Sequence, residues 1–164
     1  MGIENVSYGE MLVISQIISA HLQELGDNLR AVVVFGDLIT SGYPRNVELL
    51  EIVDEWSGPL QFSSKSSAEL PLNGELLLTF LTPNQIKRPG DMITNGNPDV
   101  EARDRMWVEQ TVRRVREGYA VVYEAVSGLV ERSLYEGTSL SMHPSPASGT
   151  VSLTNPLFGL KGAA

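Results

Sequence analysis

The chain has 164 residues, of which 42% are hydrophobic, and a formal net charge of -8 at pH 7. This length and composition suffice for one domain with its own core, and no apolar run reaches the roughly twenty residues that span a bilayer. The negative charge argues against a protein built to bind nucleic acid, because lysine and arginine contacts to phosphate supply most non-specific affinity. The chain contains no cysteine, which excludes disulfides and thiolate metal ligands. No signal-peptide pattern is present, so we expect a cytoplasmic protein.

A regular apolar spacing predicts a first helix from Ser7 to Leu25. Ser7 and Glu10 form the pattern of a capping box, and Gly26 marks the end of the helix. We expect this helix to pack against the core. His21 lies on it, and we interpret it as a surface or satisfied boundary residue, because the partners of a Ser-His-Asp or zinc site are missing from the chain.

Two apolar runs follow in AVVVFGDLITSGYPRNVELLEIVD, residues 31–54. Ala31 to Phe35 is a continuous β-branched run, which favours a strand buried on both faces, and Gly36 ends it. After a loop that contains glycine and proline, Val47 to Val53 predicts a second apolar strand, which Glu48 and Glu51 interrupt. Two neighbouring buried strands joined by a glycine loop form a natural edge for a functional site.

This segment resembles the nucleotidyltransferase superfamily typified by DNA polymerase beta and the minimal nucleotidyltransferases. In that family the first strand ends in Gly-Ser, and the second carries Asp-x-Asp, whose carboxylates hold the divalent metal ions that phosphoryl transfer needs. By this resemblance Gly36 keeps the glycine and Asp37 stands in place of the serine. Asn46 and Glu48 stand in place of the two aspartates, so one carboxylate of the two remains.

A second matching segment begins at Leu76. Leu76 to Thr82 predicts another buried strand, and Thr82-Pro83 predicts an N-cap followed by the first helical residue. In the family the third metal carboxylate lies on such a strand, and the resemblance places Thr79 at that position. Glu75, at the expected entrance of the strand, is the nearest carboxylate. Glu48 and Glu75 are therefore the candidate metal ligands that remain.

A third matching segment is VREGYAVVYE, residues 115–124, which resembles the helix end, glycine and final strand of the family. A helix is predicted from Val100 to Arg116, with Met106 on its apolar face. Gly118 is expected to end this helix in the left-handed conformation, and Ala120 to Tyr123 is a good strand.

Several arginines lie on this predicted helix and alternate with acidic residues. This pattern is typical of a solvated helix face with ion pairs, and a triphosphate-binding patch is the alternative. The arginines are Arg103, Arg105, Arg113, Arg114 and Arg116.

Two further segments carry less regular patterns. Trp56 to Gly74 is polar and is expected to form a meander or a loop over the site. Beyond Tyr123 the apolar spacing predicts one short helix that ends at Gly137, and residues 138–164 form a tail rich in Ser, Thr, Gly and Pro. The tail carries an apolar cluster that suits docking on a protein partner or a second copy: Pro156, Leu157, Phe158 and Leu160.

The sequence therefore predicts an α/β (α+β) domain over residues 1–137, with a short mixed sheet flanked by helices, and a tail over residues 138–164. The resemblance implies a nucleotidyltransferase-like fold with a degenerate metal site. Since function must be argued from the site rather than from the fold, the leading hypothesis is a non-catalytic module without a cofactor. Such a module would act through protein association as a subunit of a larger assembly.

Two alternatives remain open at this point. In the first, the protein is an active metal-dependent enzyme that uses Mg²⁺ and a nucleoside triphosphate to move a nucleoside monophosphate onto a protein or small-molecule acceptor. Asp37 and Glu48 would then be the catalytic carboxylates, and Gly36, Asp37 and Asn46 would hold the nucleotide. In the second, the protein is an antitoxin-like partner of a separately encoded protein.

Overall fold

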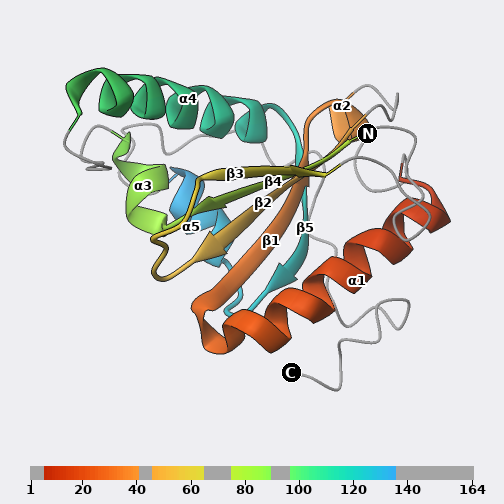
Figure 1. Ribbon diagram of the computed structural model, residues 1–164. Coiled ribbons are helices and arrows are strands. Elements are labelled where there is room, and N and C mark those ends of the chain that lie inside the picture. Colours follow the sequence, from red (N-terminus) through yellow and green to blue (C-terminus); the bar gives the residue numbers. More distant parts are fainter. Residues whose placement is uncertain (1–5, 41–45, 65–74, 90–96, 136–164) are drawn as a thin grey trace.

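The computed structural model describes residues 6–40, 46–64, 75–89 and 97–135. Within these ranges the chain forms one five-stranded mixed sheet, in the order β3-β4-β2-β1-β5, with helices against both faces (Figure 1). The predicted fold class, a short mixed sheet flanked by helices, is confirmed. No helix among the described residues combines the length and the apolar character that a membrane crossing requires.

The elements are α1 (Tyr8–Leu25), the 3-10 turn η2 (Gly26–Asn28), β1 (Leu29–Phe35), α2 (Asp37–Thr40), β2 (Val47–Val53), β3 (Gln61–Ser64), β4 (Leu76–Leu81), α3 (Pro83–Lys87), α4 (Pro98–Glu117), β5 (Tyr119–Glu124) and α5 (Leu129–Tyr135). The four strands predicted from the sequence are all present. The additional strand, β3, lies inside the polar stretch that was predicted as a meander or loop.

The central strands β1 and β2 run antiparallel to each other. β5 is antiparallel to β1, β4 is parallel to β2, and β3 is antiparallel to β4. Every residue of β2 is buried, including Glu48 and Glu51. Since a buried carboxylate needs a compensating partner, we expect Glu48 and Glu51 each to contact a polar or charged group inside the protein.

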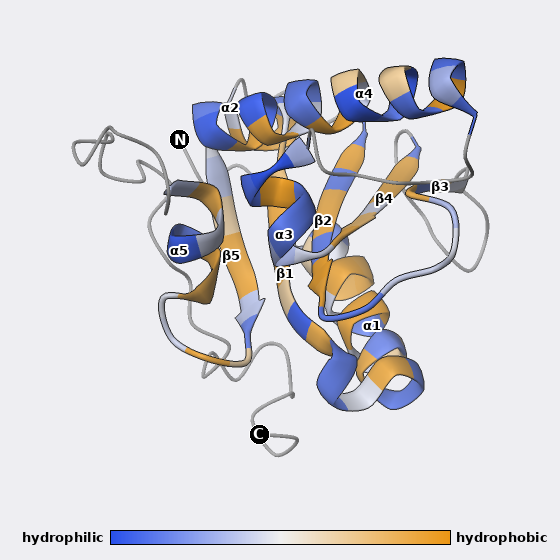
Figure 2. Ribbon diagram, turned by 90° about the vertical axis from the view of Figure 1, so that its left-hand side faces the viewer, coloured by the Kyte–Doolittle hydropathy of each residue, from blue (hydrophilic) through white to orange (hydrophobic). Residues whose placement is uncertain are grey.

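Alternating side chains of the strands supply two separate cores, one on each face of the sheet. On one face, Ile14 and Ile18 of α1 pack in the same cluster as Leu49 of β2. On the other face, Val112 of α4 packs in the cluster that contains Leu50. Figure 2 shows α1 on one side of the sheet and α3, α4 and α5 on the other, each with hydrophobic residues turned towards it.

The helix starts follow the sequence closely. Ser7 caps α1, with its side chain accepting from the backbone N–H of Glu10 while the Glu10 carboxylate accepts from the N–H of Ser7. Thr82 caps α3 in the same reciprocal way with Gln85. Both capping boxes fix where a helix begins and so set the position of the strand next to it.

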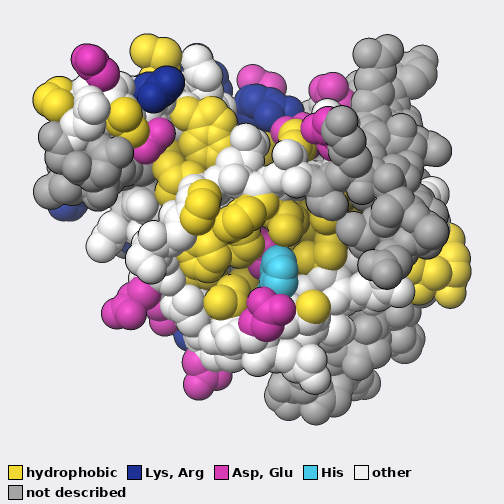
Figure 3. Space-filling view, viewed as in Figure 1, with side chains coloured by type: hydrophobic (Ala, Val, Ile, Leu, Met, Phe, Trp, Pro, Cys, Tyr) yellow, Lys and Arg dark blue, Asp and Glu magenta, His cyan; other side chains and the backbone are white. Residues whose placement is uncertain are grey.

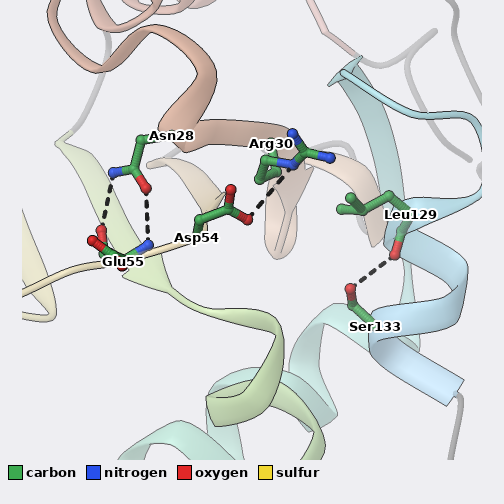
Figure 4. A network of polar contacts seen from close by, with 6 residues as sticks. All are labelled: Asn28, Arg30, Asp54, Glu55, Leu129 and Ser133. Atoms are coloured by element: carbon green, nitrogen blue, oxygen red, sulfur yellow. Dashed lines mark hydrogen bonds and ion pairs between the residues drawn. The ribbon is translucent and has the colours of Figure 1, made fainter.

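Polar contacts at the other end of the sheet fix the segment that follows β2. The Asn28 side chain accepts from the backbone N–H of Glu55 and donates to its carbonyl, at 2.8 and 2.9 Å, and Arg30 lies 3.7 Å from Asp54 (Figure 4). In the same view, the Ser133 hydroxyl donates to the Leu129 carbonyl within α5. The contacts of Asn28 hold the chain in place immediately before Trp56.

Two details of α4 differ from the sequence-based expectations. Met106 was placed on the apolar face but is 60% exposed, because the buried face of the helix is formed by Val108, Val112 and Val115. Gly118 was expected in the left-handed conformation, but its φ of 175° is extended. The glycine is needed there for space, since a Cβ at position 118 would lie 2.8 Å from the side-chain methyl carbon of Thr40.

The predicted boundary between a domain over residues 1–137 and a tail over residues 138–164 lies outside the described residues, which end at Tyr135. The apolar cluster of Pro156, Leu157, Phe158 and Leu160 lies outside the described residues, and so does Gly137, the predicted end of the last helix. The last described element is α5, which is the short helix predicted after Tyr123.

Candidate functional site

A tight glycine turn connects β1 to α2 at one edge of the sheet. Gly36 has a φ of 86°, in the left-handed region that favours glycine. Its carbonyl accepts from the backbone N–H groups of Ile39 and Thr40 and from the Thr40 hydroxyl. The turn therefore ends the strand at Phe35, as the sequence predicts, and places Asp37 at the start of α2, a short helix in a stretch that was predicted as a loop.

The glutamate of β2 next to this turn is bound by an arginine from α4. Arg114 donates from its two terminal nitrogens to the two carboxylate oxygens of Glu48, at 2.7 and 2.6 Å. The Glu48 side chain is 9% exposed and the Arg114 side chain 44% exposed. This two-pronged geometry is the strongest form of arginine–carboxylate pairing and satisfies both oxygens of the buried acid.

Gly36 lies directly against this ion pair. A Cβ at position 36 would be 2.1 Å from Oε2 of Glu48 and 3.1 Å from Nη2 of Arg114. The Arg114 guanidinium also lies over the ring of Phe35, 5.4 Å from its centroid. The glycine is thus required twice, once for its backbone conformation and once because its missing side chain leaves room for the carboxylate.

Charges around Arg114 reinforce its protonated state. The hydrogen bond to Glu48 is the largest cause of a pKa above the usual value for an arginine, and the negative charges of Glu48, Asp37 and Glu117 act in the same direction. Because the guanidinium stays charged at all physiological pH values, Glu48 faces a permanent cation supplied by the chain itself.

The other positions that the resemblance assigned to metal ligands have different contacts. The side-chain oxygen of Asn46 accepts from the backbone N–H of Glu75 at 3.0 Å, and the Glu75 carbonyl accepts from the N–H of Val47. Asn46 therefore joins the entrances of β2 and β4. Thr79 is buried on β4 opposite Leu50, and Glu75 immediately precedes β4, as predicted.

These residues do not fit the divalent metal site that the resemblance to nucleotidyltransferases implies. Both oxygens of Glu48 accept from Arg114, and the Asn46 oxygen is used within the backbone network. Among the described residues, which include Asp37, Glu48 and Glu75, no group of three acidic or histidine side chains is arranged to hold a metal. Hard divalent ions need several converging oxygens, and this site presents an arginine instead.

The arginines of α4 are only in part the solvated face that the sequence suggested. Arg103 and Arg113 are exposed, whereas Arg114 binds a buried carboxylate and Arg116 donates from Nε and Nη2 to the carbonyl of Leu134. The sequence did contain a signal for the first contact, because a glutamate inside an apolar strand needs a cation or a donor. It did not say which of the arginines would supply it.

A second buried acid on β2 is bound from the opposite face of the sheet. His21 of α1 lies with Nδ1 2.6 Å from Oε1 of Glu51, so the expectation of a satisfied boundary residue is confirmed. Sequence reasoning did not identify Glu51 as its partner, because the two residues are thirty positions apart and on different elements.

Neither the protein-family models nor the curated proteins compared with this chain give a match. The function must therefore be argued from the geometry of the site.

Proposed function

We propose that this protein is a non-catalytic, nucleotidyltransferase-like module in which an internal ion pair has taken the place of a metal site. The observation that carries the proposal is the contact between Arg114 and Glu48, in which the one acidic residue left in the Asp-x-Asp frame has both oxygens bound to a guanidinium. A metal ion would have to displace a fixed cation from that carboxylate.

The charges of the side chains at this site also support a module that binds no metal. Two metal ions carry four positive charges and need several carboxylates to hold them. The resemblance assigns neutral side chains to two of the three ligand positions, Asn46 and Thr79, and the remaining Glu48 is neutralised by Arg114. With the arginine in place, the net charge of these four side chains is about zero.

In this proposal the ion pair has a structural role. It joins β2 to α4 across the turn at Gly36, so it holds together the strand, the helix and the loop that would surround a substrate in an active relative. A buried acid with its arginine contributes specificity of packing as well as energy, because each partner alone would be costly to bury.

Calorimetric titration of the full chain with nucleoside triphosphates, with and without Mg²⁺, tests the proposal. We expect no Mg²⁺-dependent binding to the wild-type chain. Arg114→Gln should also show none, because Asn46 and Thr79 add no carboxylate. Arg113→Gln, a substitution at the neighbouring exposed arginine, is the matched control. Mg²⁺-dependent binding to the wild type that is lost in Glu48→Gln would overturn the proposal in favour of an active transferase.

We further propose that the module works by protein association through its tail, as a subunit of a larger assembly or with a second copy. The support is compositional, since Leu157 and Phe158 form an apolar cluster in an otherwise polar segment. The wild-type full chain and the double variant Leu157→Ser, Phe158→Ser are each used as bait in affinity capture. The self-association of both proteins is measured by sedimentation. We expect the double variant to lose the association, and a complex that it retains would remove the tail from the account.

A further inference from the structure

The pair formed by His21 and Glu51 links α1 to the middle of the sheet. Glu51 on β2 is 0% exposed, and the His21 side chain is 19% exposed, so the imidazole separates the buried carboxylate from solvent. Oε1 of Glu51 lies 2.6 Å from Nδ1 of His21. Oε2 of Glu51 is the one buried side-chain nitrogen or oxygen atom in the described part of the chain that has no hydrogen-bond partner. Glu51 therefore depends on His21 for its charge compensation.

The surroundings of the pair are apolar and aromatic. Phe80 lies beside Glu51 in the parallel register of β2 and β4, and its ring centroid is 5.8 Å from that of His21. Trp56 stacks on Phe80 at 4.2 Å, and Phe62 meets Phe80 edge to face. Figure 3 shows hydrophobic side chains gathered on this side of the molecule next to a histidine and acidic side chains. Such surroundings strengthen electrostatic interactions and penalise an isolated charge.

Among the residues that the structure describes, few other charges act on the pair. Glu24, one turn further along α1, adds a negative charge that favours protonation of both partners. β4 contributes no titratable side chain, and Arg30 of β1 is paired with Asp54 at the end of β2. The protonation of the pair is thus governed by its own two members and by Glu24.

The direction of both pKa shifts is the same. The hydrogen bond to Glu51 is the largest cause that raises the pKa of His21, against the opposing effect of burial. Burial raises the pKa of Glu51, against the opposing effect of His21. The pair therefore retains its shared proton to a higher pH than a free histidine would. When that proton leaves, Nδ1–H can still donate, but the carboxylate loses the positive charge that compensates it.

We propose that His21 and Glu51 form a proton-dependent latch that holds the C-terminal half of α1 against the sheet. With the proton bound, the helix end stays docked over Phe80. Without it, the buried carboxylate favours conformations in which this end of the helix moves away and water reaches Glu51. This inference does not depend on the proposed function.

The opening is local because the two halves of α1 are buried to different degrees. Ile14 and Ile18 are fully buried in the core, so the helix stays anchored as far as residue 18. Leu22 and Leu25 are only partly buried against the same cluster, and the helix ends at Gly26. Residues 19–25 are therefore the segment that the latch controls, and its release uncovers Phe80, which is 4% exposed and lies against the His21 ring.

Two measurements on the full chain test the latch together. The pKa of His21 is measured by NMR in a His143→Gln background, which leaves one histidine signal. Amide hydrogen exchange of residues 19–25 is followed between pH 6 and pH 9 and corrected for the intrinsic pH dependence of exchange. By linkage, each unit by which the pKa of His21 exceeds the ordinary histidine value of about 6.5 corresponds to about a tenfold loss of protection across the titration.

Variants separate the latch from simple fraying of a helix end. Glu51→Gln removes the buried charge and should make protection of residues 19–25 independent of pH. Glu24→Gln, a neighbouring acid outside the pair, should keep the pH dependence and shift its midpoint to lower pH. Equal protection of the wild type at pH 6 and pH 9, or an unshifted His21, would overturn the proposal. So would a pH dependence that persists unchanged in Glu51→Gln.

Discussion

The guanidinium of Arg114 binds both oxygens of Glu48, at 2.7 and 2.6 Å, although the two residues are sixty-six positions apart in the chain. This contact joins a central strand to the helix that covers it. It also determines what the edge of the sheet at Gly36 offers to a ligand: a guanidinium that is already paired and, within the described ranges, no group of three acidic or histidine side chains that could hold a metal.

A double-mutant cycle measures how strongly the pair is coupled. Arg114→Ala leaves Glu48 without its donors, and we expect a loss of about 2 kcal/mol in the free energy of unfolding, at the lower end for a charged hydrogen bond because the arginine is partly exposed. Glu48→Gln combined with Arg114→Ala should lose clearly less than the sum of the single variants. Urea unfolding of the four proteins gives the coupling. Additive losses would contradict a mutual interaction, and Arg113→Ala, the control, should change stability by less than about 0.5 kcal/mol.

Gly36 should tolerate no side chain. Gly36→Ala combines an unfavourable φ of 86° with a Cβ 2.1 Å from Oε2 of Glu48. Gly26→Ala is the matched control, since Gly26 also has a positive φ, 57°, but its Cβ would meet nothing within 4 Å. Gly26 has a ψ of −130°, and we expect Gly26→Ala to cost about 1–3 kcal/mol from backbone strain alone, and Gly36→Ala to cost at least about 1 kcal/mol more.

Making Gly36→Ala in a Glu48→Ala background identifies the cause of the additional loss of stability. In Glu48→Ala the carboxylate is absent, so Gly36→Ala should cost at least about 1 kcal/mol less there than in the wild type, with only the backbone strain remaining. Thermal or urea unfolding gives all four values. An excess that remains in the Glu48→Ala background would show that the ion pair is not what excludes a side chain at position 36.

Gly118 should be limited by space rather than by backbone conformation. Its extended φ suits any residue, but a Cβ would press on the methyl carbon of Thr40 at 2.8 Å. We expect Gly118→Ala to destabilise by about 1 kcal/mol or more through overpacking. Thr40→Ser removes the methyl group and keeps the hydroxyl that donates to Gly36, so it should restore most of the loss. A Gly118→Ala variant that Thr40→Ser does not improve would point to another cause.

Overall stability should fall as the pH rises above neutrality. The pKa values of His21 and Glu51 are both raised in the folded protein. The stability that each group contributes is therefore present below its unfolded pKa and is lost as the pH rises through its folded pKa. Urea unfolding at pH 6.5 and pH 9 is compared between the wild type and Glu51→Gln. The decrease should be larger in the wild type, and an equal decrease in both would assign it to other groups.

Much of the fold could be predicted from the sequence because its signals are local. The apolar β-branched runs gave four strands, and Ser7 and Thr82 marked two helix starts through their capping boxes. β3 was missed because QFSS is polar and short, and its pairing with β4 depends on residues elsewhere in the chain. Gly118 was misinterpreted for a similar reason, since the neighbour that requires a glycine, Thr40, is distant in sequence.

The candidate site was predictable in position but not in chemistry. Gly36, Asp37 and Glu48 do lie at one edge of the sheet, where the spacing placed them. The sequence could not show that Arg114, among the several arginines of α4, would reach Glu48, because the reach depends on how the helix lies across the sheet. The same limit applies to the partnership of His21 with Glu51, which joins opposite elements through tertiary packing.

If Arg114 stands where a metal ion would bind Glu48, as we propose, the full chain should have no specific site for Mn²⁺, and electron paramagnetic resonance measures this binding. Mn²⁺ takes the same oxygen ligands as Mg²⁺ and gives a direct signal of the bound ion. We expect the wild type and Glu48→Gln to show the same weak, non-stoichiometric binding that is typical of an acidic surface. One tightly bound Mn²⁺ per chain that disappears in Glu48→Gln would contradict the proposal and show that the carboxylate still serves a metal.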